Sequence, residues 1–91
     1  MSHVLVFTDQ YNRRASRFLK RHPEPRQQYL KTLLRLEANP YHPSLRLHAL
    51  AGRLTGLHSV SINMSYRITL ELMVQGQEII LVNVGDHQAV C

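Results

Sequence analysis

The chain has 91 residues, of which 44% are hydrophobic, and a formal net charge of +5 at pH 7. Its length fits one small domain, and its apolar content argues against wholesale disorder. The single cysteine, Cys91, excludes an internal disulfide framework and a cysteine-based zinc site. No apolar run approaches the ~20 residues of a membrane span, and no signal peptide is recognisable. We therefore expect one domain over residues 1–91, located in the cytoplasm and without a membrane partner.

The first half of the chain predicts a strand followed by two helices. Residues 3–7 are apolar and partly β-branched, as in a short strand. A helix follows, capped by Thr8 or Asp9. Its apolar residues recur at helical spacing and are Tyr11, Ala15, Phe18 and Leu19. The sequence His-Pro-Glu-Pro ends this helix, and Pro25 suits the first turn of a second helix that runs to Ala38. The short link predicts a helical hairpin.

The second half predicts strands. Residues 45–48 form a possible short edge strand, and residues 57–63 alternate, with Val60 and Ile62 facing the core. Residues 66–74 alternate again. One face would hold Tyr66, Ile68, Leu70 and Leu72, and the other Arg67, Thr69 and Glu71. After a turn, residues 78–84 form a mostly apolar strand that suits a central position.

The resulting order, β-α-α-β-β-β(-β), predicts an α+β fold in which the N-terminal helical hairpin packs on a mainly antiparallel sheet. Neither repeats nor low-complexity segments interrupt it.

Positive charge is concentrated in the front of the chain. Ten of the eleven lysines and arginines lie between Arg13 and Arg53, where the only acids are Glu24 and Glu37. This asymmetry favours a polyanionic partner, which could be RNA, DNA or an acidic protein. A solvated helix surface explains the charges about equally well.

Three residues are candidates for chemistry on a phosphodiester. Arg67 lies on the strand face opposite the core, where a guanidinium can bind a phosphate through two hydrogen bonds. His87 follows Gly85 just beyond the last strand and could transfer a proton near neutral pH. His48 lies on a segment whose polar side could share a cleft with Arg67. Each also has a plain reading, as a solvated surface residue.

Other kinds of site are not indicated. His58 has the parity of the core residues in its strand, and His3, His22 and His42 are expected in loops and on the surface. Six histidines occur, but no H-x₃-H or HExxH spacing. We therefore expect no metal site and no other cofactor.

These features, taken in order, resemble the RelE/ParE superfamily of toxin–antitoxin toxins. The resemblance covers nearly the whole chain and includes the basic helical hairpin, Ser65-Tyr66-Arg67-Ile68 and the closing Val-x-Val-Gly-x-His. It implies a ribosome-dependent mRNA endonuclease that cleaves by metal-independent attack of the 2′-hydroxyl on the phosphodiester, with an antitoxin protein, the ribosome and mRNA as partners. Arg67, His87 and His48 match catalytic positions of its RelE and YafQ-like branches. The residues implied to bind ribosomal RNA are Arg13, Arg14, Arg17, Lys20, Arg21, Lys31 and Arg53.

The chain departs from the YafQ-like pattern at four positions. Ser61 and Ser65 stand where that branch has His and Asp, Asn83 where it has an arginine, and Cys91 where it has a terminal aromatic residue. The alternatives are therefore a catalytically weakened member that binds its antitoxin and represses the operon with it, or a DNA gyrase inhibitor of the ParE type.

Overall fold

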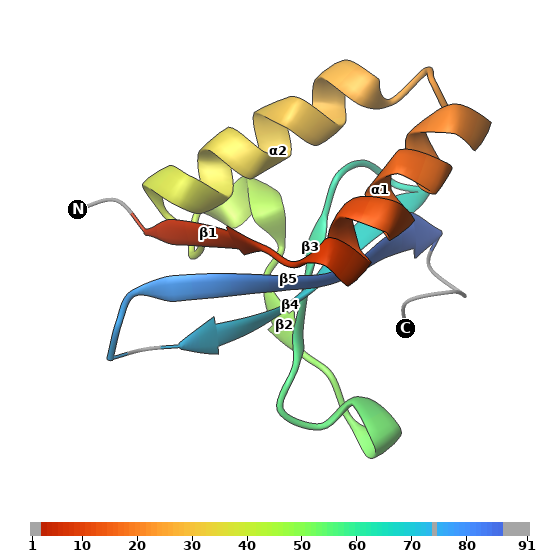
Figure 1. The fold of residues 1–91 in the computed structure, drawn as a ribbon. Helices are drawn as coiled ribbons and strands as arrows, with labels where there is room; N and C mark the ends of the chain where they lie inside the picture. Colours follow the sequence, from red (N-terminus) through yellow and green to blue (C-terminus); the bar gives the residue numbers. More distant parts are fainter. Residues whose placement is uncertain (1–2, 74, 87–91) are drawn as a thin grey trace.

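The computed structural model describes residues 3–73 and 75–86. The elements of this part of the chain, in order, are β1 (Val4–Phe7), α1 (Asp9–Arg21), α2 (Arg26–Ala38), the 3₁₀ turn η1 (Pro43–Leu45), β2 (His48–Ala49), the 3₁₀ turn η2 (Gly52–Leu54), β3 (His58–Ser61), β4 (Tyr66–Met73) and β5 (Glu78–Asp86). The predicted α+β fold is confirmed (Figure 1).

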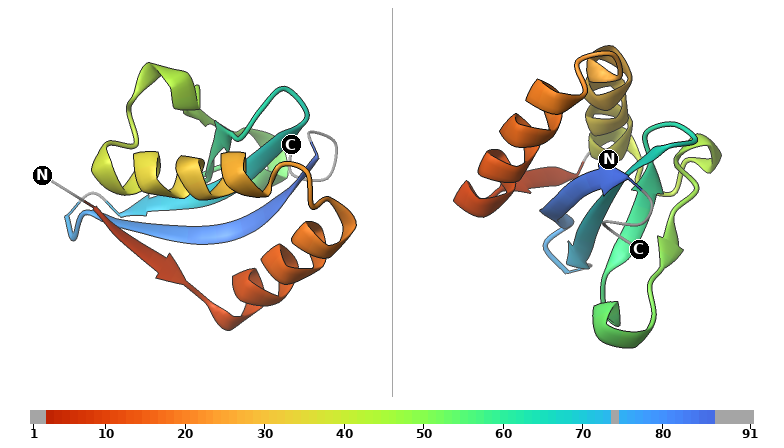
Figure 2. Two further views of the ribbon diagram at one scale, coloured as in Figure 1. Left: turned by 90° about the horizontal axis from the view of Figure 1, so that it is seen from above. Right: turned by 90° about the vertical axis from the view of Figure 1, so that its right-hand side faces the viewer.

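The five strands form one sheet in the order β1-β5-β4-β3-β2. Strand β1 runs parallel to β5, and the other neighbours are antiparallel. Both helices lie on the same side of this sheet, as Figure 2 shows from two directions, and neither helix covers the opposite side. The molecule therefore has a helix layer and a sheet layer, and one face of the sheet is left without a helix. We call this second face the open face.

Local sequence determines where the two helices begin and end. The Thr8 side chain accepts a hydrogen bond from the Tyr11 N–H at 3.0 Å and caps α1, as predicted. The helix ends at His22, whose N–H bonds to the Phe18 carbonyl. Pro25 is the N-cap of α2 rather than a residue of its first turn, because its carbonyl already accepts the first helical bond, from Tyr29.

The predicted strand over residues 45–48 is wrong except at its end. The His42 imidazole accepts a hydrogen bond from the Ser44 N–H, and this closes η1 around Pro43. Arg46 then takes a left-handed conformation with φ 51°, which interrupts any extended chain. Strand β2 begins only at His48, and β3 ends at Ser61, before the predicted residue 63.

The core lies between the helices and the sheet. Strand β4 supplies Ile68 and Leu70, which are fully buried, and β5 supplies Ile79, Leu81 and Val84. The predicted alternation in β4 is confirmed, and β5 extends two residues beyond its predicted end.

A bulge interrupts the β4–β5 ladder. Leu70 pairs with Leu81, but Thr69 pairs with Asn83, so Val82 has no partner in β4. The bulge reverses the faces of the residues that follow it. Val84 therefore joins the core, while Asn83 lies in the row of Thr69.

A pair of tyrosines ties the two helices together. The hydroxyl groups of Tyr11 on α1 and Tyr29 on α2 are 2.8 Å apart, and both side chains are buried. Burial raises the pKa of each phenol above its ordinary value, because the charged form would lose its hydration. Both hydroxyls therefore stay neutral across the physiological range, and each is the partner of the other.

We expect Tyr29→Phe to lower the free energy of unfolding by about 1–3 kcal/mol, because it leaves the buried Tyr11 hydroxyl without a partner. The variant in which both tyrosines are phenylalanine should be more stable than Tyr29→Phe alone, since it also removes the buried Tyr11 hydroxyl that would otherwise lack a partner. Urea unfolding of the wild type, both single variants and the double variant measures this. A double variant less stable than either single one would contradict the pairing.

Candidate functional site

Arg67 lies on the open face of the sheet, near one end of β4. Its Cα partners are Ser61 in β3 and Gly85 in β5. The side chain is half-buried, and Nη1 lies 3.5 Å from the Ser59 hydroxyl oxygen, at the limit of a hydrogen bond. The guanidinium is therefore directed along β3 toward Ser59.

His48 lies on the same face, two strands away, with β3 between β2 and β4. It is the Cα partner of Ser59, the residue toward which the guanidinium of Arg67 points. Directly paired residues of antiparallel strands have Cα atoms about 4.5–5.5 Å apart. The structure thus brings Arg67 and His48 to either side of one small residue, on the open face.

A backbone carbonyl determines which ring nitrogen of neutral His48 carries the hydrogen. The Nδ1 atom lies 3.3 Å from the Arg46 carbonyl oxygen, which can only accept a hydrogen bond. Nδ1 therefore carries the hydrogen in the neutral ring, and Nε2 is left as a base. The left-handed conformation of Arg46 is part of the loop that holds this carbonyl two residues before the imidazole. Since the His48 side chain is exposed, Nε2 is open to a substrate.

Two buried hydroxyl groups accompany these side chains. Ser59 and Thr69 are paired across β3 and β4, and their exposed fractions are only 0% and 1%. Sequence reasoning placed Thr69 on the open face but did not single out either residue. The alternation of each strand places a residue on a face but does not show which residues of neighbouring strands are paired, so it could not reveal this pair.

The positions that depart from the YafQ-like pattern are occupied by locally bonded side chains. The Ser61 hydroxyl donates to the Asn63 carbonyl at 2.7 Å, and Ser65 lies in the turn that the Asn63 side chain closes. Asn83 lies in the row of Thr69, but its Oδ1 accepts from the Val84 N–H at 2.9 Å. Neither the two serines nor Asn83 can carry the charge of the His, Asp or Arg that the YafQ-like pattern has at these positions. His87 and Cys91 lie outside the described residues.

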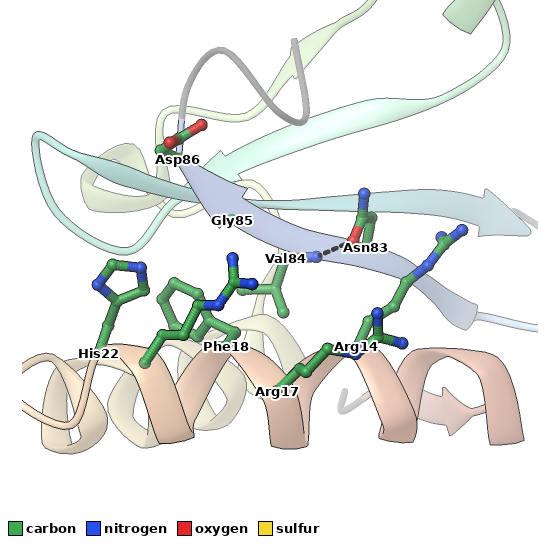
Figure 3. A pocket seen from close by; sticks show the side chains of 9 residues that line it. Arg14, Arg17, Phe18, His22, Asn83, Val84, Gly85 and Asp86 are labelled. Atoms are coloured by element: carbon green, nitrogen blue, oxygen red, sulfur yellow. Dashed lines mark hydrogen bonds between the residues drawn. The ribbon is translucent and has the colours of Figure 1, made fainter.

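A pocket of about 350 Å³ lies between α1 and the C-terminal half of β5. Basic groups of the helix face the strand across it, as Figure 3 shows for Arg14, Arg17 and His22. Its lining also includes Arg21 and, at the end of β5, Asp86. We call it the α1–β5 pocket. It is on the helix side of the sheet, whereas Arg67 is on the open face.

The remaining basic residues predicted to bind RNA are spread more widely. Arg13 and Lys20 line an adjoining groove on the outer side of α1, together with Arg17. Lys31 is exposed on α2, and Arg53 is exposed in η2, on the loop that projects from the sheet in Figure 1. The structure therefore gathers the α1 residues into one surface and leaves Arg53 apart from it.

His22 is not the plain surface residue that the sequence predicts. Its ring packs against Phe18 and Tyr66, with centroids 5.3 Å and 4.9 Å apart, and its Nδ1 lies 3.0 Å from the Tyr66 hydroxyl. The prolines that follow it end α1 there and direct the chain toward α2. His58 lies opposite Leu70 on the core side, as predicted, and its Nδ1 is buried without a hydrogen-bond partner.

Two further observations bear on the kind of site. Across residues 3–73 and 75–86, no three side chains among His, Cys, Asp and Glu gather closely enough to hold a metal ion. In the same part of the chain, no helix has the length and apolar character needed to cross a membrane.

A helical hairpin on one face of a mainly antiparallel sheet is the fold of RelE-like toxins, and solved structures of such toxins share it with this chain. YafQ from E. coli strain BL21(DE3) superposes with a TM-score of 0.71 and 18% identity over 96% of each chain. The YoeB/ParE toxin from Agrobacterium tumefaciens gives 0.73 and 15%, over 92% of this chain and 98% of that one. The E. coli DinJ-YafQ complex gives 0.69 and 19% over 97% of each chain.

The common fold thus confirms the resemblance to RelE/YafQ-like toxins that the sequence predicts. No protein-family model matches the sequence, and no curated protein matches it either. At these levels of identity the likeness defines the fold, and the activity depends on the side chains described above.

Proposed function

We propose that this protein is the toxin of a type II toxin–antitoxin module and that it cleaves mRNA on the ribosome. The observation that carries the proposal is the placement of Arg67 and His48 on either side of Ser59, on the open face of the sheet. The fold of known toxins supports the same assignment.

The two side chains have complementary roles in this reaction. Arg67 binds the scissile phosphate and offsets the negative charge that develops on its oxygens in the transition state. The Nε2 atom of His48 takes the proton of the 2′-hydroxyl, whose oxygen then attacks the adjacent phosphorus. The bond to the 5′-oxygen breaks, and that oxygen receives a proton from a general acid. His87 is proposed for this last role from the family resemblance. The products are a 2′,3′-cyclic phosphate and a 5′-hydroxyl, and no metal takes part.

The partners follow from the same assignment. Two similar structures are complexes of E. coli YafQ with DinJ, and one of them is named a toxin–antitoxin complex. We propose a cognate antitoxin for this chain too. The α1 surface of Arg13, Arg14, Arg17, Lys20 and Arg21, with Lys31 and Arg53 as separate contacts, is proposed to bind ribosomal RNA.

A catalytically weakened toxin is the second candidate, and the bonding of Ser61 and Asn83 favours it. Both side chains bond to nearby backbone groups, at positions where the YafQ-like branch has a histidine and an arginine. Such a protein would bind its antitoxin and repress the operon without efficient cleavage.

Controlled expression without an antitoxin tests the proposed function. We expect growth to stop and primer extension to show new mRNA ends within translated regions. Fragments should carry 5′-hydroxyl ends and 2′,3′-cyclic phosphates, so that adapter ligation to their 5′ ends requires prior phosphorylation. Intact mRNA together with normal growth would support the weakened alternative, and 5′-phosphate ends would contradict the 2′-hydroxyl mechanism.

A further inference from the structure

We propose that the α1–β5 pocket is a second phosphate site, which binds a backbone phosphate of RNA on the side of the sheet opposite Arg67. This inference rests on the proposed function for the identity of the ligand as RNA. Of the α1 surface proposed above to contact ribosomal RNA, the arginines that line the pocket are assigned to the cleaved strand, whereas Arg13 and Lys20 lie outside the pocket.

Three arginines supply the positive charge of the pocket. Arg14, Arg17 and Arg21 are spaced by three and four residues and therefore project from one side of α1. Like charges at this spacing destabilise a helix, and the only acid within α1 is Asp9, in its first turn. With Asp86 counted at the pocket's end, three positive charges and one negative charge leave a net charge of +2. Such a charged pocket favours an anion.

One of the arginines is held in place by the strand. Val82 lies at the bulge and beyond the end of the β1–β5 pairing, and its carbonyl accepts a hydrogen bond from Arg14 Nη1 at 2.9 Å. Arg14 is half-buried, so its guanidinium is fixed before any ligand binds. Fixing a donor in advance lowers the entropy cost of binding.

The strand side of the pocket does not suit an added peptide strand. Strand β1 pairs with β5 only from Glu78 to Leu81, so the rest of β5 has β4 on one side alone. However, the Val82 carbonyl is bonded to Arg14, and the Val84 N–H is bonded to the Asn83 side chain. A peptide could not form a regular ladder here without breaking both bonds. The groups left for a ligand are guanidinium donors, whose forked geometry matches phosphate oxygens.

His22 completes the pocket beside these arginines. Its Nδ1 bonds with the Tyr66 hydroxyl, and its ring packs against both Phe18 and Tyr66, so its orientation is fixed. When the hydroxyl donates to Nδ1, the neutral ring carries its hydrogen on Nε2, which is then a further donor for an anion.

The pocket and the candidate catalytic site meet at the same end of the sheet. Gly85 lines the α1–β5 pocket, and it is also the Cα partner of Arg67. An RNA strand whose scissile phosphate lies on Arg67 would therefore pass the free side of β5 and place a neighbouring phosphate among the arginines of α1.

The test measures binding of a fluorescent single-stranded RNA decamer by anisotropy at several salt concentrations. All proteins carry Arg67→Ala, so that cleavage does not interfere and a failed nuclease assignment leaves the binding result readable. We expect Arg17→Gln/Arg21→Gln to weaken binding roughly tenfold or more and to reduce the slope of log K against log salt by about 0.7, for the one phosphate contact that is lost. The matched double variant Arg26→Gln/Arg35→Gln removes the same charge from exposed positions of α2 and should leave the slope unchanged.

A second variant gives the opposite sign, which misfolding could not imitate. Asp86→Asn removes the one carboxylate that lines the pocket, so RNA should bind more tightly and with a steeper salt dependence. Equal losses in the two double variants would overturn the proposal in favour of nonspecific charge. It would also be overturned if a poly-aspartate decamer bound more tightly than RNA and alone responded to Arg17→Gln/Arg21→Gln, since the pocket would then belong to an acidic peptide.

Discussion

Replacing Arg67 with alanine is expected to lower the rate of mRNA cleavage by about two to three orders of magnitude, the usual cost of removing one donor that stabilises a transition-state oxygen. The guanidinium lies over the open face, and its one hydrogen bond in the described structure is long, at 3.5 Å. Losing so long a bond should change the stability of the fold little, so a loss of cleavage can be attributed to the lost phosphate contact. Cleavage of a ribosome-bound message by purified protein measures the rate.

Two further variants separate the effect of the Arg67 geometry from the effect of losing a positive charge. Arg67→Lys keeps the positive charge but not the forked geometry, so it should recover only part of the rate. Arg35→Ala removes an exposed charge from α2 and should cleave as the wild type does. Full activity of Arg67→Ala, with an unchanged unfolding midpoint, would mean that the assigned phosphate site is wrong.

Sequence alone placed Arg67 correctly because β4 is regular. Its apolar residues alternate without interruption from Tyr66 to Leu72, and a strand with one face on the core has no other register available to it. The helical hairpin was predictable because its helix ends depend on local sequence. Thr8 caps the start of α1, and the prolines on either side of Glu24 separate the end of α1 from the start of α2.

In β5 the residues do not alternate regularly between the two faces of the sheet, and the position of Asn83 depends on this irregularity. An unbroken strand would place Asn83 on the face of Leu81, in the core. The bulge at Val82 places it instead in the row of Thr69, and the Val82 carbonyl accepts the hydrogen bond from Arg14. A bulge depends on pairing between strands, so the local sequence of 78–84, which is almost uniformly apolar, does not reveal it.

Long-range contacts account for the other residues that sequence reasoning missed. The environment of His22 is created by Tyr66, 44 residues further along the chain. Ser59 gained its place beside Arg67 and His48 from the register of three strands. Similarly, the 3₁₀ turn η1 forms where the start of a strand was predicted. The His42 side chain caps this turn by accepting a hydrogen bond, and the spacing of apolar residues gives no sign of that bond.

Replacing His48 with alanine is expected to lower the cleavage rate by about a hundredfold or more, as for loss of a general base. The reason lies in the neighbouring backbone, because the Arg46 carbonyl keeps the hydrogen on Nδ1 and leaves Nε2 to accept the 2′-hydroxyl proton. His48 is exposed at the start of β2, so the variant should fold normally. The rate is again measured on a ribosome-bound message.

The role of His48 as base rather than acid can be separated with a modified substrate. If sulfur replaces the 5′-oxygen at the cleavage site, the leaving group departs as a thiolate and needs no proton, whereas the 2′-hydroxyl must still lose one. His48→Ala should therefore show its full defect on the sulfur-containing message. His87→Ala, which removes the proposed acid, should lose most of its defect there. If the two variants respond in the reverse order, His48 is the acid and the proton assignment from the Arg46 carbonyl is wrong. If neither variant slows cleavage of the normal message, proton transfer is carried out by other groups, and the open face serves only to bind phosphate.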